Sequence, residues 1–177
     1  MNLHKLVKDN YQTCTTRRFR KRKCALKLDS CSDYTVTGID IDKFAKEHKL
    51  SDQANDKLCD FILLISDGLV GVLAIALELK SGEFNATEAY EQLQAGANYI
   101  NAICNGERLA LLLPVVLHKG ANVIQTKKLA KYIVRFSGDE YEIIRKPCGI
   151  GLKDIMKEYF VSGKPKARKR RLVRYKR

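Results

Sequence analysis

Residues 58–80 read LCDFILLISDGLVGVLAIALELK, which is two almost wholly apolar runs separated by Ser66-Asp67-Gly68. Runs of this kind are typical of central strands that are covered on both faces of a sheet. An Asp-Gly pair between two such runs predicts a hairpin and not a membrane-spanning helix. We therefore expect two adjacent strands at the centre of one sheet.

These two strands contain few polar side chains, and three of those carry charge: Asp60, Glu78 and Lys80. A charged group in an apolar strand is costly unless it is paired or binds a metal. Because side chains alternate along a strand, Glu78 and Lys80 point to the same face. Asp60 joins that face only if the connecting loop has an odd number of residues or an equivalent bulge. We predict a three-residue loop, 67–69, which sets Asp60 opposite Ala76 and one diagonal step from Glu78.

Two carboxylates beside a lysine suit a hard divalent cation, Mg²⁺ or Mn²⁺, whose coordination is completed by water and phosphate oxygens. Ala74 and Ala76 share the face of Glu78, and their small side chains are expected to leave room for a ligand. The metal would lower the pKa of a bound water molecule, and Lys80 would orient that water or stabilise developing charge. The chemistry indicated is hydrolysis of a phosphodiester bond.

Apolar periodicity predicts the elements on either side of the hairpin. Before it we expect an amphipathic helix over 2–12, a basic loop over 15–32, a strand over 33–42, and a polar segment over 43–57 with one helical turn. After it, Asn85 is the predicted N-cap of a helix of about five turns, with Glu88 completing an approximate capping box.

The second half of the chain predicts a strand over 108–117, in which Pro114 requires an edge position or a bulge. The spacing of apolar residues between Leu129 and Phe136 predicts a second amphipathic helix, followed by a strand over 141–145 and a helix over 152–160. This order of elements indicates an α/β fold with one central mixed β-sheet flanked by helices.

The 177-residue chain is 45% hydrophobic and has a formal net charge of +13. That composition suits one packed domain and excludes a disordered chain, a collagen-like chain and a disulfide scaffold. The positive charge is concentrated in residues 17–23 and 164–177, and the rest of the chain is close to neutral. The pattern favours a polyanionic partner, DNA first with RNA as the alternative, although a polybasic tail also suits an anionic membrane surface or a nuclear address. The candidate nucleic-acid-binding residues are Arg17, Arg18, Arg20, Lys21, Arg22, Lys23, Arg168, Lys169, Arg170, Arg171 and Arg174.

Residues 1–11 contain Lys5, Lys8 and Asp9 and lack the apolar run of a signal peptide, so we expect an intracellular, cytoplasmic protein associated with nucleic acid and not with a membrane. The six cysteines show no C-x-x-C spacing. A structural zinc site is therefore not expected, and free thiols in a reducing compartment are.

Asp60 on one strand, Glu78-Leu79-Lys80 at the end of the next, and the capped helix that follows resemble the PD-(D/E)xK nuclease superfamily. The resemblance spans residues 1–146 and implies a restriction-endonuclease-like αβββαβ core. It also implies that Asp60, Glu78 and the main-chain carbonyl of Leu79 bind the metal and that Lys80 is the catalytic lysine. Cys59 stands where the family has a proline, a position in which the proline is often absent.

Two further residues are carried over from this resemblance. Many relatives take an acidic residue from the first helix, and Asp9 is the one available here. A subset has a glutamine followed four residues later by a tyrosine on the helix after the lysine, and neither Gln92 nor Gln94 has that spacing to Tyr99. Gln92 is still expected to face the site, because it lies one helical turn beyond Glu88.

We therefore predict a small metal-dependent DNA endonuclease, with a nuclease-like domain over 1–160 and a basic tail over 161–177. Cutting both strands with one site per chain would suggest a homodimer. One alternative is a non-catalytic nucleic-acid-binding module on the same fold, with the three charges as a structural ion pair; another is a basic protein recruited to RNA or ribosomes. Asp40 and Asp42 are expected to be solvated at a strand end, and His118 to be exposed in a loop.

Overall fold

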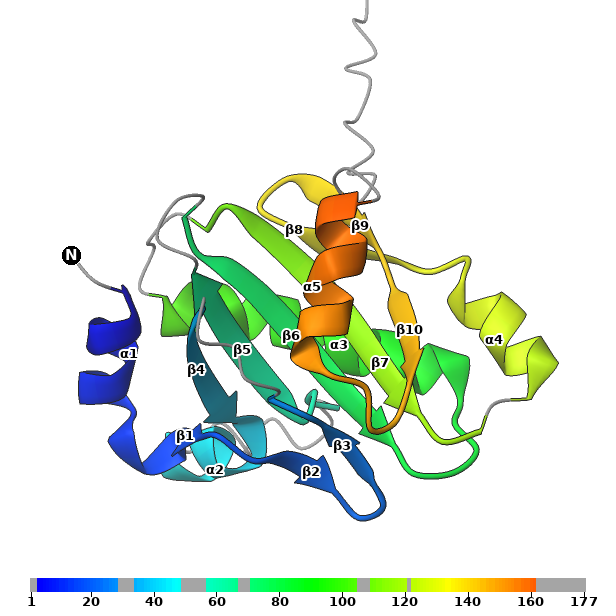
Figure 1. Ribbon diagram of the computed structural model, residues 1–177, viewed down its shortest axis with the longest axis horizontal. Helices are drawn as coiled ribbons and strands as arrows, with labels where there is room; N and C mark the ends of the chain where they lie inside the picture. Colours follow the sequence, from blue (N-terminus) through cyan, green and yellow to red (C-terminus); the bar gives the residue numbers. More distant parts are fainter. Residues whose placement is uncertain are drawn as a thin grey trace, which may run out of the picture.

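The computed structural model describes residues 3–28, 34–48, 57–66, 71–104, 109–120 and 122–161. Its centre is a six-stranded sheet with the strand order β1-β4-β5-β6-β7-β10 (Figure 1). The strands from β1 to β6 pair antiparallel, whereas β7 runs parallel to β6 and β10 parallel to β7. The bounds are β1 Thr15–Thr16, β4 Thr35–Asp40, β5 Phe61–Ser66, β6 Leu73–Lys80, β7 Leu111–His118 and β10 Ile144–Pro147.

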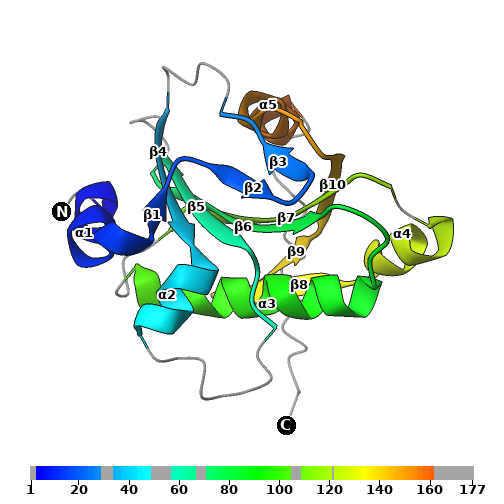
Figure 2. The same ribbon diagram turned by 90° about the horizontal axis from the view of Figure 1, so that it is seen from below.

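The sheet separates two apolar clusters of side chains. Figure 2 shows the helices and strands that lie on its two sides. On one side lies α3 (Ala86–Ile103), and α1 (Leu3–Asn10) and α2 (Ile41–Glu47) belong to the same cluster. On the other side lie the hairpin of β2 (Phe19–Lys21) with β3 (Cys24–Leu26) and the helix α5 (Leu152–Val161). A short 3₁₀ helix (Gln12–Cys14), α4 (Val123–Leu129) and a hairpin of β8 (Ile133–Phe136) with β9 (Asp139–Glu142) complete the described chain.

The predicted α/β class with a central mixed sheet is confirmed. The predicted helices near residues 2–12, 85–104 and 152–160 are present, and the N-cap is correct, because the Asn85 side chain accepts hydrogen bonds from the backbone N–H groups of Thr87 and Glu88. Within the described ranges, no helix is both long and apolar enough to cross a membrane.

The predicted helix over 129–136 is wrong. Helix α4 ends at Leu129, and residues 133–136 form β8, in which Val134 and Phe136 are buried and Arg135 is exposed. Ser137 and Gly138 both have positive φ, 49° and 88°, which is the geometry of a tight hairpin turn that glycine favours. The strand predicted over 141–145 is likewise two strands, β9 and β10, which belong to different sheets.

The region predicted as a basic loop, 15–32, contains β1 and the β2–β3 hairpin, and residues 29–33 lie outside the described chain. Cys24 of this hairpin forms a disulfide with Cys148, so the expectation of free thiols is wrong for this pair. Pro114 lies inside β7, but the ladder between β7 and β10 begins only at Val115, so the missing N–H of Pro114 falls outside it. The segment predicted as polar, 43–57, contributes to helix α2, which begins at Ile41. Residues 162–177 of the basic tail lie outside the described residues.

Candidate active site

The pairing of β5 with β6 brings the two predicted carboxylates together. Phe61 pairs with Leu77, and continuing this register by one residue sets Asp60 opposite Glu78. Asp60 and Glu78 therefore share a face of the sheet, as an odd-numbered connection between the two strands predicts. The pairing of β5 with β6 is shifted by two residues from the predicted register. Ile65 pairs with Leu73, whereas a three-residue loop would pair it with Gly71. Residues 67–70 of the connection lie outside the described chain.

The face that carries Glu78 is filled by helix α3 along most of its length. Ala74 and Ala76 belong to the cluster that includes the apolar side of α3, so the expected room for a ligand above these alanines is not there. Gly96 explains the close approach, since a Cβ at this position would lie 2.5 Å from Cys59 Sγ and 3.3 Å from Ala76 Cβ. The small residues thus admit a helix, and the site is confined to the strand end.

Asp60 is almost wholly buried, with 3% of its surface exposed. Its Oδ2 accepts a 2.7 Å hydrogen bond from the backbone N–H of Leu79, and its Oδ1 forms an ion pair with Lys21 Nζ. Burial raises the pKa of Asp60, and the hydrogen bonds from Lys21 and Leu79 oppose that rise. The N–H and C=O of one strand residue point toward the same neighbouring strand, so the Leu79 carbonyl also faces the Asp60 side.

Glu78 is as deeply buried as Asp60, with 2% exposed. Its Oε1 lies 2.9 Å from Lys80 Nζ, while its Oε2 is buried and has no hydrogen-bond partner among the described residues. Burial, reinforced by the negative charge of Asp60, raises the pKa of Glu78 to about 7. One carboxylate oxygen in this pair is therefore free to bind a proton or a cation.

Lys80 is held between the sheet and helix α3. Its Nζ donates a 2.7 Å hydrogen bond to Gln92 Oε1, and Glu88 Oε1 lies 3.7 Å away. Gln92 Nε2 donates in turn to the carbonyl of Leu58 at 3.2 Å, which fixes the amide. Gln92 thus lies where the sequence placed it, beside Lys80, and its amide holds the lysine ammonium.

Lys21 is the site residue that sequence reasoning placed elsewhere, among the nucleic-acid-binding cations. Lys21 and Phe19 share a face of β2, and Phe19 is buried with its ring centroid 5.5 Å from that of Phe61. Lys21 therefore points inward to Asp60, and its Nζ is also 3.6 Å from Asp42 Oδ2. The i, i+2 spacing from Phe19 is the corresponding sequence signal, but it indicates an inward lysine only once Phe19 is known to be buried. Burial disfavours the ammonium of Lys21, but the hydrogen bond and charge of Asp60 outweigh it and raise its pKa.

The remaining candidates fall outside this cluster or differ from expectation. Asp9 is exposed on α1, and no contact among the described residues joins it to the site. Asp40 is not simply solvated, because its side chain caps α2 by accepting from Lys43 N at 3.2 Å. His118 is not in an exposed loop: it ends β7, is half-buried, and pairs in register with Lys80. The other cations of the hairpin region are exposed, and those of the tail lie outside the described chain; they are Arg17, Arg18, Arg20, Arg22 and Lys23, and Arg168, Lys169, Arg170, Arg171 and Arg174.

The cluster offers two acidic side chains for a metal ion. Across the described ranges, no group of three or more His, Cys, Asp or Glu side chains is placed to hold one. The chain matches no family model, no curated protein and no solved structure. Its function is therefore inferred from the geometry of the site.

Proposed function

We propose that this protein is a metal-dependent nuclease of the PD-(D/E)xK type, an endonuclease that hydrolyses phosphodiester bonds of DNA. The observation that carries the proposal is the meeting of two buried carboxylates, Asp60 and Glu78, beside the ammonium group of Lys80. Bringing two like charges together in an apolar environment is unfavourable for folding. Such clusters of perturbed titratable groups occur preferentially at functional sites.

The order of the elements supports the same proposal. Helix α1, the antiparallel strands β4, β5 and β6, helix α3 and the parallel strand β7 occur along the chain in the order of an αβββαβ core of the restriction-endonuclease-like fold. In the described chain, the additional elements within this order are the 3₁₀ helix, β1, β2 and β3 between α1 and β4, and α2 between β4 and β5. Asp60 immediately precedes the second of these strands, and Glu78 and Lys80 end the third. This is the placement that the resemblance of the sequence implies.

The side chains present fit a divalent cation. Glu78 Oε2 lacks a partner within the described structure, and Asp60 Oδ1 already binds a positive charge, the ammonium of Lys21. Asp60 and Glu78 would hold Mg²⁺ or Mn²⁺, with the Leu79 carbonyl as a third protein ligand. When bound, the metal supplies an activated water and shields the phosphate. Lys80, fixed by Glu78 and Gln92, orients the attacking water or stabilises charge on the phosphate oxygen.

Lys21 is the counter-ion of Asp60. Its ammonium pairs with Asp60, so a metal that binds this carboxylate must displace it. The side chain of Lys21 is 47% exposed, which leaves it free to move toward solvent or a phosphate group once displaced. Lys21 therefore lowers the metal affinity of the free protein and adds a cation beside the bound backbone.

The runner-up is a non-catalytic nucleic-acid-binding module, and one observation favours it. Each carboxylate already has a lysine partner, Lys21 for Asp60 and Lys80 for Glu78, so the four charges balance without a metal. In this reading the exposed cations still bind the nucleic-acid backbone, but no bond is cut.

Incubation with a panel of substrates distinguishes the two functions. Supercoiled plasmid, single-stranded DNA and RNA are each mixed with the wild-type protein, with and without Mg²⁺ or Mn²⁺, beside Lys80→Ala and the charge-matched surface control Lys46→Ala. We expect metal-dependent cutting of DNA that Lys80→Ala loses and Lys46→Ala keeps. Intact substrates with salt-sensitive gel shifts for all three proteins would instead establish the binding module. Preferential cutting of RNA would change the substrate class, and sedimentation in the presence of DNA tests the predicted homodimer.

A further inference from the structure

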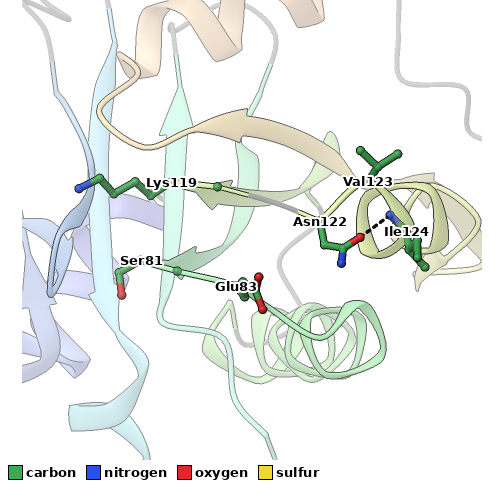
Figure 3. A pocket seen from close by; sticks show the side chains of 8 residues that line it. Ser81, Glu83, Lys119, Asn122, Val123 and Ile124 are labelled. Carbon is green, nitrogen blue, oxygen red and sulfur yellow. Dashed lines mark hydrogen bonds between the residues drawn. The ribbon is translucent and has the colours of Figure 1, made fainter.

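An open cleft begins one residue beyond the proposed catalytic lysine. The ends of β6 and β7, with the start of α4, border a shallow, open volume of about 800 Å³. It is lined by Ser81, Gly82, Glu83, Lys119, Gly120, Asn122, Val123 and Ile124 (Figure 3). The backbone N–H of Lys119 donates a 3.1 Å hydrogen bond to the carbonyl of Lys80. Ser81, the first residue of its lining, directly follows Lys80, so one end of the cleft lies beside the strand end that carries the candidate site.

Two apolar side chains at one wall of this cleft are exposed to solvent. Val123 is 65% exposed and Ile124 is 70% exposed. Among the described residues, these two are the large hydrophobic side chains that are exposed to solvent. Neither contributes to the core of the protein, so burial within the fold does not account for them. Because the two side chains are adjacent and lie beside a polar cleft, we interpret them as part of a contact surface for a partner.

The apolar pair is held on a fixed element. Asn122 caps α4 by accepting a 2.8 Å hydrogen bond from the backbone N–H of Ile124, as Figure 3 shows. Gln125 Oε1 accepts a hydrogen bond from the backbone N–H of Ala86 at 2.9 Å, which fastens α4 to the start of α3. Val123 and Ile124 are thus presented in a defined position relative to the site.

The charges around the pair are mostly positive. Lys127 and Lys128 are exposed in the last turn of α4, and Lys119 is exposed on the cleft with its side chain directed away from α4 (Figure 3). Glu83 is the single acidic residue of the lining. A surface with lysines on either side of an apolar contact complements a nucleic-acid strand, whose phosphates are anionic and whose bases are apolar on their faces.

We propose that Val123 and Ile124 pack against bases of the bound nucleic acid next to the scissile phosphate, and that the flanking lysines contact its phosphates. The inference rests on the proposed function for the class of ligand. Apolar side chains that enter a groove unstack neighbouring bases, and this contact requires no particular base sequence. The cleft thus holds the strand that runs past Lys80 and keeps it in line with the site.

Binding without cleavage tests this surface separately from catalysis. Oligonucleotide duplexes and single strands with the fluorescent base aminopurine are titrated with the full chain in Ca²⁺ and in EDTA, and both anisotropy and aminopurine emission are recorded. We expect the wild type to raise the emission, because the base unstacks. The double substitution Val123→Ser with Ile124→Ser is expected to abolish that rise and weaken binding by about tenfold. Both residues are exposed, so the melting temperature of this variant should match that of the wild type.

The control is Lys127→Ala, which should keep the emission change but reduce the salt dependence of binding by about one phosphate contact. Unchanged affinity and emission in the double variant would overturn the proposal. A change in the oligomeric state of the double variant, with DNA binding unchanged, would also overturn the proposal. That result would identify Val123 and Ile124 as a contact between copies of the chain. Absence of any binding by the wild type would overturn it as well. If the wild type unstacks aminopurine but never cuts, the nuclease function fails and this surface stands.

Discussion

Replacement of Lys21 by methionine tests the proposal that its ammonium competes with a metal ion for Asp60. The substitution keeps the length and apolar stem of the side chain but removes the charge that pairs with Asp60 Oδ1. It leaves Asp60, which is 3% exposed, without its ion-pair partner when no metal is bound, and the more distant charge of Lys80 remains. The variant should therefore be less stable than the wild type in EDTA and should bind Mn²⁺ more tightly.

The size of both effects follows from the exposure of the pair. Breaking a fully buried ion pair costs about 3–5 kcal/mol, and an exposed pair contributes at most about 1 kcal/mol. Asp60 is buried, but the Lys21 side chain is 47% exposed, so solvent screens the pair and about 1–2 kcal/mol is the reasonable expectation. The wild type must give up this free energy when a metal displaces Lys21, which corresponds to about 5- to 30-fold tighter Mn²⁺ binding by the variant.

Calorimetric titration with Mn²⁺ measures the affinity, and thermal denaturation in EDTA and in excess Mn²⁺ measures the stability. The matched control is Lys23→Met, because Lys23 is an exposed cation at the turn of the same hairpin. We expect the control to behave as the wild type and Lys21→Met to gain a larger increase in melting temperature from the metal. Equal or weaker Mn²⁺ binding by Lys21→Met would refute the competition, and Lys21 would then be a purely structural partner of Asp60.

Three further outcomes are expected. The pKa of Glu78 is raised from its ordinary 4.5 to about 7, so the folded state holds this proton more tightly than the unfolded state. In EDTA, Glu78 should therefore cost the wild type up to about 3 kcal/mol of unfolding free energy as pH rises from 4.5 through 7. Denaturant melts at a series of pH values should show a smaller loss for Glu78→Gln, in which Asp60, whose pKa is also raised by burial, still titrates. Gly96→Ala should lower stability by about 1–3 kcal/mol, because its Cβ would lie 2.5 Å from Cys59 Sγ; Gly82→Ala, with open space around it, is the control, and equal melting temperatures would contradict the tight packing of α3. Gln92→Leu should reduce cleavage about 10- to 100-fold by releasing Lys80, and Gln92→Glu, which keeps an acceptor oxygen, should retain more activity; equal loss in the two variants would mean that the hydrogen bond does not position the lysine.

The convergence of Asp60 and Glu78 was predictable from the sequence because it depends on local properties. Two apolar runs define adjacent strands, and the period of two decides which side chains share a face. The exact offset was not predictable, since the register depends on the backbone path between Ser66 and Leu73. The helix predicted over 129–136 was wrong for a related reason. A short set of apolar residues fits both the helical and the strand period, and the Ser137-Gly138 turn, with positive φ at both residues, forms a hairpin there.

The features that the sequence did not predict depend on contacts between segments that are far apart in the chain. Ala74 and Ala76 indicated space, but Gly96 lets α3 occupy it, and no local pattern specifies which helix packs on which strand. Lys21 is 39 residues from Asp60 in the chain, and its basic neighbours suggested a solvated segment. Its inward direction follows only once Phe19 is known to pack on Phe61.

The most direct test of the central claim is a comparison of wild type and Glu78→Gln in a plasmid-nicking assay with Mn²⁺. Glutamine keeps the shape of the buried side chain and removes the charge that a metal needs, so the variant should fold at least as stably in EDTA. We predict Mn²⁺-dependent nicking by the wild type and none by Glu78→Gln, together with loss of Mn²⁺ binding in calorimetry. Equal nicking by a folded Glu78→Gln protein, or equal Mn²⁺ binding by both, would contradict a metal site built on Asp60 and Glu78.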